Sequence, residues 1–235
     1  MNKPITTLFM LMSVDGKIST SDNDSLDVDK DFPRIIGVKE GLYQYYELEK
    51  ETDLYSFNSG RVLAKVGINN KQDNIKKLPV SFLVIDNQPH LTLLGVENLL
   101  AKGKRLFVIT TNKNHPAFEK QKESNIEIIY YENAIDFVNL FQRLKDEFDI
   151  DRLTIQTGSE LNSIFLRNKL IDKISIVVAP VLIGGKNTAS LIGGESLHAV
   201  DELINMKALK LEKVDVLKNS YIHLKYNVVN ETEIK

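Results

Sequence analysis

Apolar residues along this chain gather in short runs that alternate with helical patterns. Runs rich in β-branched and aromatic residues predict strands over residues 5–12, 53–57, 80–85, 105–110, 126–130, 152–156 and 173–181. Most of these runs are nearly continuous, as expected for strands covered on both faces. The pattern predicts a three-layer α/β fold, in which helices cover both faces of a mostly parallel central sheet.

Two longer segments repeat their apolar residues with helical spacing. Residues 38–50 and 134–148 predict helices. In the second segment, apolar residues recur at positions 137, 140, 141, 144 and 148, which form one stripe along a helix. We expect this stripe to pack into the core.

The pattern changes after residue 208. Residues 209–217 and 221–229 predict two long strands joined by a turn at 218–220. In the second strand, alternation with polar residues predicts one buried face, made of Ile222, Leu224, Tyr226 and Val228. We therefore expect a mixed sheet with an antiparallel hairpin at or near its edge.

Length and composition indicate a globular protein. A chain of 235 residues with 43% apolar and 26% charged residues can bury a sizeable core, and we expect a single domain over residues 1–235. The net charge of −2 gives no reason to expect binding to nucleic acid or to an anionic membrane. No apolar run is long enough to span a bilayer and cysteine is absent, so we expect a cytoplasmic protein.

Several common kinds of site are poorly supported. The four histidines are scattered without the spacing of metal ligands, so we expect no metal. The sequence also lacks the G-x-S-x-G motif of hydrolases, the G-x-G-x-x-G fingerprint and the P-loop. A nucleotide, if bound, must be held in another way.

The best candidate for a phosphate site follows the expected strand 152–156. Thr157 can cap a helix there, and Glu160, three residues later, would complete a capping box. Gly158 has no side chain to hold a ligand away from the backbone, so amides at the positive end of the helix would face a diphosphate. A well-capped helix without a ligand is the alternative, and the carboxylate of Glu160 would compete with an anion for the amides.

Three other polar loops follow expected strands, at residues 58–61, 86–87 and 111–114. Ligands of open α/β sheets gather at the carboxyl ends of strands, so these loops are expected to share one crevice. The long loops 19–30 and 67–77 are candidates for covering a ligand.

Four short motifs occur in a fixed order along the chain. They are SVDGKI at 13–18, TG at 157–158, KLIDK at 169–173 and APVLIGG at 179–185. Together they resemble the reductase domain of riboflavin biosynthesis, which has a dihydrofolate-reductase-like fold, across about residues 5–229. The resemblance implies an oxidoreductase that reduces a C=N or C=O bond of a small pyrimidine-like or pterin-like metabolite with NADPH, often as a homodimer.

The resemblance also implies roles for particular residues. It places the nicotinamide beside Leu11 and the turn at 13–19, and the adenosine 2′-phosphate near Asn87. Residues expected to approach the cofactor phosphates are Gly60, Arg61, Gly158, Ser159, Glu160, Leu161 and Asn162. The substrate is expected near Lys17, Ser25 and Gln156, and Asp15 is the candidate catalytic residue, either as proton donor or, as we favour, in orienting its loop.

The chain departs from the family pattern on the substrate side. Glu49 stands where the family has a phosphate-binding arginine, and Gln156 where it has a glutamate. Arg34, Lys39 and Lys65 are candidates for supplying the missing positive charge. Two alternatives stay open: a non-catalytic nucleotide-binding or regulatory protein on the same fold, and an enzyme that uses another nucleotide without hydride transfer.

Overall fold

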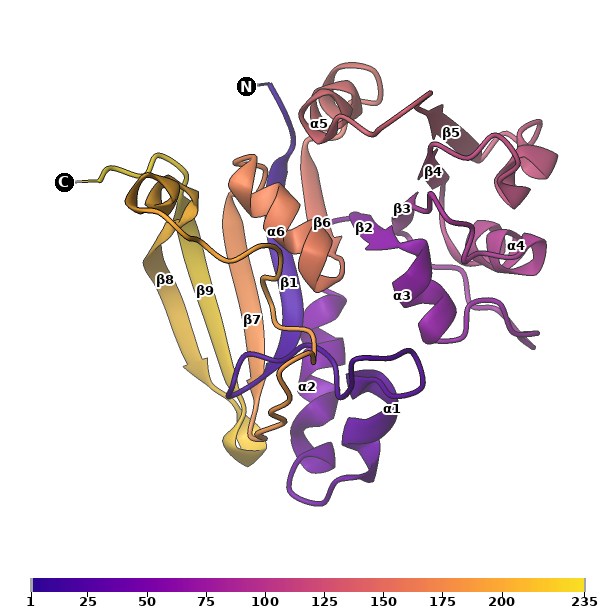
Figure 1. Ribbon diagram of the computed structural model, residues 1–235. Helices are drawn as coiled ribbons and strands as arrows, with labels where there is room; N and C mark the ends of the chain where they lie inside the picture. The colour runs from indigo at the N-terminus through magenta and orange to yellow at the C-terminus, as the bar shows by residue number, and fades with distance from the viewer. Residues whose placement is uncertain (1, 235) are drawn as a thin grey trace. The chain divides into compact units, whose positions relative to one another are not determined.

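The computed structural model describes residues 2–234, which divide into two compact units (Figure 1). The first unit contains residues 2–4 and 53–157, and the second contains residues 5–52 and 158–234. The expectation of a single domain over 1–235 stays a prediction, and its end positions 1 and 235 lie outside the described residues.

The first unit is built on five parallel strands in the order β5-β4-β3-β2-β6. Their bounds are β2 (Tyr55–Ser59), β3 (Ser81–Ile85), β4 (Leu106–Thr110), β5 (Ile126–Tyr130) and β6 (Arg152–Gln156). The connections between them carry the helices α3 (Gly60–Lys65), α4 (Leu93–Lys102), η2 (Pro116–Lys120) and α5 (Phe137–Asp146). Each predicted strand of this unit lies within two residues of an observed one, which confirms the pattern-based prediction.

Helices pack on both faces of these strands. On one face, Val96 and Leu99 of α4 join Val84 and Val108 in a buried cluster. On the other, the predicted stripe of α5 is confirmed, since its central residues are fully buried and Phe141 lies 5.8 Å from Phe57 between ring centroids. Covering both faces explains why the strand sequences are almost continuously apolar.

The second unit is built on four strands in the order β1-β7-β9-β8. Their bounds are β1 (Ile5–Ser13), β7 (Lys173–Ala179), β8 (Ala208–Val216) and β9 (Ile222–Val229). The helical segments are α1 (Val28–Asp31), η1 (Phe32–Arg34), α2 (Lys39–Glu49), α6 (Ser159–Arg167), η3 (Val200–Asn205) and η4 (Lys218–Ser220). β1 and β7 are parallel, whereas β9 pairs antiparallel with β7 and with β8, so the mixed sheet and its edge hairpin are confirmed.

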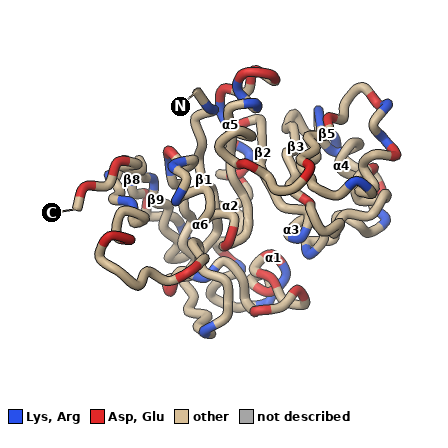
Figure 2. Tube along the Cα trace, turned by 45° about the horizontal axis from the view of Figure 1, so that its top comes forward, with Lys and Arg blue, Asp and Glu red and all other residues tan. Residues whose placement is uncertain are grey.

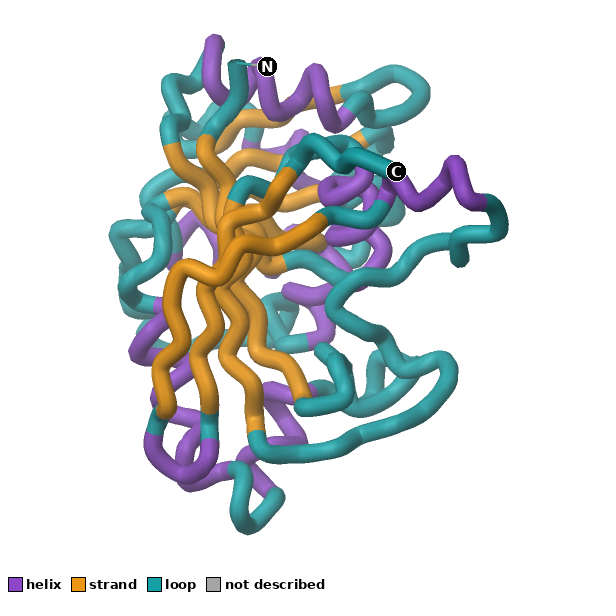
Figure 3. Tube along the Cα trace, turned by 90° about the vertical axis from the view of Figure 1, so that its left-hand side faces the viewer, coloured by secondary structure: helices purple, strands orange, loops and turns teal. Residues whose placement is uncertain are grey.

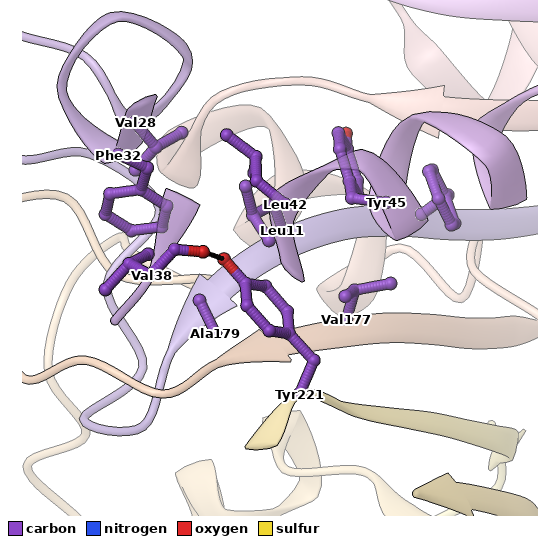
Figure 4. Packing of buried hydrophobic residues seen from close by; sticks show 10 residues of the cluster. Leu11, Val28, Phe32, Val38, Leu42, Tyr45, Val177, Ala179 and Tyr221 are labelled. Atoms are coloured by element: carbon purple, nitrogen blue, oxygen red, sulfur yellow. Dashed lines mark hydrogen bonds between the residues drawn. The ribbon is translucent and has the colours of Figure 1, made fainter. Parts of the chain in front are cut away.

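Helix α2 closes the core of the second unit. Figure 4 shows Leu42 and Tyr45 of this helix packed over Leu11 of β1 and Val177 of β7. The buried Tyr221 reaches the same cluster, and its Oη donates a hydrogen bond of 2.7 Å to the carbonyl of Val38. A buried phenol needs such a partner, so this bond fixes the start of β9 against the start of α2.

The predicted burial of the hairpin is wrong in one respect. His223, predicted on the wetter face of β9, is only 2% exposed, while Ile222 is 37% exposed. The Nε2 atom of His223 lies 2.8 Å from the Oγ atom of Ser175 on β7, so a polar partner makes burial of the imidazole possible. The alternation in the sequence showed that β9 has two different faces. Which side chains become buried depends on the groups that pack against the strand.

Among the described residues, no helix is both long enough and apolar enough to cross a bilayer.

Candidate functional site

The turn after β1 is closed by backbone bonds. The amide of Ser13 donates to the carbonyl of Lys17 at 2.9 Å, and the amide of Gly16 donates to the carbonyl of Ser13 at 3.0 Å. Gly16 has a φ of +80°, a conformation that glycine adopts without strain. The turn therefore has a definite shape and projects the side chain of Asp15.

Asp15 is fully engaged as an acceptor. Its carboxylate accepts hydrogen bonds from Ser13 Oγ at 2.6 Å, from the amide of Ile183 at 3.0 Å and from the amide of Gly184 at 2.6 Å. The bond from Ser13, followed by those from the two amides, lowers the pKa of Asp15 to about 2. An aspartate that stays ionised has no proton to give at neutral pH, which supports the orienting role over the donor role.

The expected substrate residues of the second unit, Lys17 and Ser25, both have hydrogen-bond partners within that unit. Lys17 Nζ donates to the carbonyl of Thr188 at 2.8 Å. The amide of Ser25 donates to Asn23 Oδ1 at 2.9 Å, and its hydroxyl contacts the same oxygen. Leu11 is buried in the core cluster, so a contact with a ligand would come from its backbone. The roles of these residues stay predictions.

The predicted capping box at the start of α6 is wrong. The N-cap of this helix is Gly158, not Thr157, and no side chain caps it. Glu160 reaches away from the first turn, and its Oε1 accepts a bond of 3.2 Å from the amide of Gly194. The anticipated competition between Glu160 and an anion for the first-turn amides therefore does not arise in this geometry.

The start of α6 is open next to Gly158. An ideal Cβ built on Gly158 would meet no heavy atom within 4 Å. Ser159 and Asn162, by contrast, are buried, and Asn162 Nδ2 donates to the carbonyl of Leu191 at 2.8 Å. An uncapped helix start beside empty space is a place where amides can bind a diphosphate, so these residues fit that group.

Two of the predicted polar loops of the first unit meet at the ends of β3 and β4. Asn87 Oδ1 accepts a bond of 3.0 Å from the amide of Thr111, which ties the two strand ends together. Gly60, at the start of α3, lies against the end of β3, because a Cβ on Gly60 would fall 2.5 Å from Asp86 Oδ1. The space that a ligand would need at Gly60 is thus filled by a carboxylate, while Asn87 remains exposed.

Asp86 is the centre of a buried polar cluster that our sequence interpretation missed. Its carboxylate accepts bonds from the amides of His90 and Leu91 and from the imidazoles of His90 and His115, all between 2.9 and 3.1 Å. Burial would raise the pKa of Asp86, but the bond from His115 and those from Leu91 and His90 outweigh it and lower the pKa. His115 Nδ1 accepts the amide of Ala117, so its Nε2 carries the proton that Asp86 accepts. An aspartate directly after a predicted strand was the available signal.

Gln156, at the end of β6, takes part in a second polar network of this unit. Its Oε1 accepts a bond of 2.9 Å from Ser56 Oγ, which in turn accepts from Asn58 Nδ2 at 2.9 Å. All three side chains belong to paired positions of β2 and β6. Arg61, the other expected cofactor residue of this unit, is exposed near the start of α3.

Several acidic residues lie in and next to α1, where Figure 2 shows red segments; the first turn of the helix contains Asp29 and Asp31. Asp29 Oδ1 accepts a bond of 2.8 Å from Tyr46 Oη. Although Asp29 has an exposed surface, desolvation by the surrounding chain raises its pKa to about 6, and the charges of Asp27 and Glu49 act in the same direction. Glu49, the departure from the family arginine, thus adds to an acidic cluster.

A family model described as the RibD C-terminal domain matches residues 4–222. The chain belongs to this family. RibD of Actinobacillus pleuropneumoniae is 26% identical over 90% of the chain, which spans about half (54%) of that relative's length. The 2,5-diamino-6-ribosylamino-4(3H)-pyrimidinone 5′-phosphate reductase of Methanothermobacter thermautotrophicus is 27% identical over 93% of both chains.

Solved structures of the RibD family share the fold. Acinetobacter baumannii RibD matches 97% of the chain and 59% of its own with a TM-score of 0.66 and 19% identity. The riboflavin biosynthesis reductase Rib7 of Saccharomyces cerevisiae matches 97% of the chain and 91% of its own with a TM-score of 0.62 and 16% identity. The expected three-layer α/β fold of dihydrofolate-reductase-like reductases is thereby confirmed.

Proposed function

We propose that this protein is an NADPH-dependent reductase that acts on a C=N or C=O bond of a small heterocyclic metabolite of the pyrimidine or pterin type. Two findings support this proposal. The chain matches the RibD family model, and it is similar over nearly its full length to a relative that is named a pyrimidinone phosphate reductase. The single structural observation that carries it is the open, uncapped start of α6 at Gly158.

The amides of Ser159, Glu160 and Leu161 form the first turn of α6 and would hold the cofactor diphosphate. They lie at the positive end of the helix, which favours a negative charge, and Gly158 lets the diphosphate approach the backbone. NADPH supplies the hydride when bound. The chain's own contribution is to align donor and acceptor carbons and to exclude water.

The acidic cluster around α1 bears on the choice of substrate. Desolvation raises the pKa of Asp29, and the negative charges of Asp27 and Glu49 act in the same direction. The same negative charges would repel a phosphate placed near them. We therefore propose that the group bound near this surface is uncharged or cationic, and that the substrate differs there from that of the reductase relatives.

Titration with NADPH and NADH, followed by nicotinamide fluorescence, tests the proposal. We expect NADPH to bind, and its absorbance to fall when a pyrimidine or pterin carbonyl substrate is added. Binding without oxidation across pterins, flavin precursors and simple carbonyls would favour a non-catalytic nucleotide-binding protein. Failure to bind either dinucleotide would contradict both readings.

We also propose that the chain forms a homodimer through β8. Every residue of this edge strand is exposed or half-buried, and Figure 3 looks onto this edge. Its apolar side chains are Leu209, Leu211, Val214 and Val216, between 44% and 85% exposed. An open edge strand with apolar side chains exposed along it invites pairing, and a second copy of the chain would cover these side chains. The cytoplasmic location stays a prediction.

A further inference from the structure

The irregular segment of residues 181–194 joins two parts of the proposed dinucleotide site within the second unit. It follows β7 and contains no helix or strand of its own. We call this segment the strap. A stretch of this length without regular structure is ordered only where other groups hold it, so the positions of its fastenings show what it does.

The near end of the strap is fastened to the turn after β1 by Asp15. The carboxylate of Asp15 accepts the amides of Ile183 and Gly184, and the amide of Val14 donates to the carbonyl of Val181 at 2.9 Å. Gly184 has a φ of +72°, which points its amide at the carboxylate without strain. Because the aspartate is ionised, these are charge-assisted bonds, which are stronger than bonds between neutral groups.

The middle of the strap runs antiparallel to the same turn. The amide of Ile18 donates to the carbonyl of Ala189 at 3.0 Å, and the amide of Leu191 donates to the carbonyl of Gly16 at 2.9 Å. Lys17 forms an isolated β-bridge with Ser190. The turn and the strap thus form one hydrogen-bonded piece.

The far end of the strap is fastened to the first turn of α6. The amide of Gly193 donates to the carbonyl of Ser159 at 3.1 Å, and the amide of Gly194 donates to Glu160 Oε1. The approach is close, since a Cβ on Gly193 would lie 2.5 Å from Ser159 Oγ. These contacts use a carbonyl and a side chain of the helix, so the strap holds α6 without using the first-turn amides.

We propose that Asp15 is a positioning residue of the dinucleotide site, which acts through the strap: the carboxylates of Asp15 and Glu160 fasten its two ends and fix the turn after β1 against the start of α6. This inference rests on the proposed function, because the first turn of α6 is the place assigned to the diphosphate. Asp15 affects dinucleotide affinity without contacting the dinucleotide. In return, binding of the dinucleotide at the first turn of α6 stabilises the turn that carries Asp15.

The test compares the wild type with Asp15→Asn by amide hydrogen exchange and by NADPH titration. Asp15→Asn keeps the shape of the side chain but removes its charge and one acceptor. We expect exchange at Ile183 and Gly184 to become about tenfold faster, with smaller acceleration at Gly193 and Gly194, and NADPH affinity to fall about tenfold. Asp201→Asn, which changes an exposed aspartate of η3, is the matched control and should change neither measurement.

A readout at a distance separates positioning from a purely structural role. In the wild type, NADPH should slow exchange at Gly193 and Gly194 and also at Ile183 and Gly184, while in Asp15→Asn the protection should stop at the α6 end. Glu160→Gln, at the α6 end of the strap, should likewise reduce the slowing of exchange that NADPH causes at Ile183 and Gly184.

Three outcomes would overturn the inference. Wild-type NADPH affinity in Asp15→Asn despite faster exchange would show that the strap does not shape the site. Lost affinity with unchanged exchange would show that Asp15 acts directly. Failure of the wild type to bind NADPH or NADH would contradict the proposed function and this inference together, whereas the first two results contradict this inference alone.

Discussion

Gly60 and Gly158 stand at the starts of two helices, and their surroundings differ. The Cβ position of Gly60 is occupied by the buried carboxylate of Asp86, whereas that of Gly158 is open. The sequence suggested the same ligand-binding role for both glycines. At the scale of single residues, the structure gives Gly60 a packing reason to be glycine and leaves Gly158 available to a ligand.

Replacing each glycine by alanine separates the two roles. Gly60→Ala should lower the free energy of unfolding by about 1–3 kcal/mol, because the methyl group overlaps Asp86. Gly158→Ala should leave the free energy of unfolding nearly unchanged and weaken NADPH binding, because its φ of −76° suits alanine and the new methyl enters the open space. Urea unfolding and NADPH titration of both variants provide the measurements. Equal stability of the two variants would contradict the packing argument.

The buried His223 should make the free energy of unfolding depend on pH. Burial lowers its pKa from the ordinary 6.5, with the charge of Lys225 acting in the same direction. The unfolded chain then binds the proton more tightly than the folded chain, so His223 makes stability fall as the pH drops below about 6.5. Urea unfolding at several pH values should show a smaller loss in His223→Gln. His198→Gln, which keeps His223, should retain the wild-type dependence; a wild-type dependence in His223→Gln would contradict this account.

The pKa of Asp29 can be tested in the same pH range. Its carboxyl should titrate near pH 6 in the folded protein, and Glu49→Gln should lower that pKa because a repelling charge is removed. Tyr46→Phe should raise it, because the bond from Tyr46 stabilises the ionised form. Carbon-13 NMR of the carboxyl carbon measures each shift. Opposite signs for the two variants are required, and shifts of the same sign would refute the assignment.

At the scale of elements, helix α5 shows how a local signal and tertiary packing combine. Its N-cap, Asp136, accepts the amide of Asn139 at 3.0 Å, and its apolar stripe is buried in the first unit. Burial of the stripe determines which face of the helix packs against the core, and the cap determines the residue at which the helix begins. The predicted start at residue 134 was too early, because the helix begins at Phe137, the first residue of the apolar stripe, directly after the cap.

Removing the cap should have a measurable effect on stability. Asp136→Ala should lower the free energy of unfolding by about 1 kcal/mol, since the amide of Asn139 loses its acceptor. Asp136→Asn is the matched control, because asparagine caps helices about as well and should preserve most of the stability. Chemical unfolding of the wild type and the two variants measures these free energies. Equal losses of stability in both variants would indicate that the charge of Asp136, and not its capping bond, matters.

At the scale of the whole molecule, the exposed β8 edge bears on assembly. The proposed homodimer predicts that Leu211→Lys together with Val214→Lys yields a monomer, because two charges cannot be buried without partners. Sedimentation equilibrium at micromolar concentration measures the effect, and Lys210→Gln on the same strand should leave the dimer intact. A monomeric wild type would contradict the proposed homodimer.

Much of the fold could be predicted from the sequence because it depends on periodicity. The strands of the first unit, the helix stripe at Phe141 and the edge hairpin all follow from apolar patterns that local geometry imposes. The candidate site was harder. Asp15 and Gly158 were identified from motifs, but the partners of Asp15 and Glu160 lie in the strap, far along the chain, and no local pattern pairs them.

Local patterns in the sequence were enough to locate the strands and the helices α2 and α5, to indicate a glycine turn after β1, and to show which family the motifs resemble, but helix α4 was not predicted. Tertiary packing, in contrast, makes Glu160 hold Gly194 instead of capping α6, places Asp86 in the space at Gly60, and buries His223 on β9. The physical reason is that backbone conformation follows from neighbours in sequence, whereas the partner of a polar side chain is whichever group the completed packing brings within hydrogen-bonding distance.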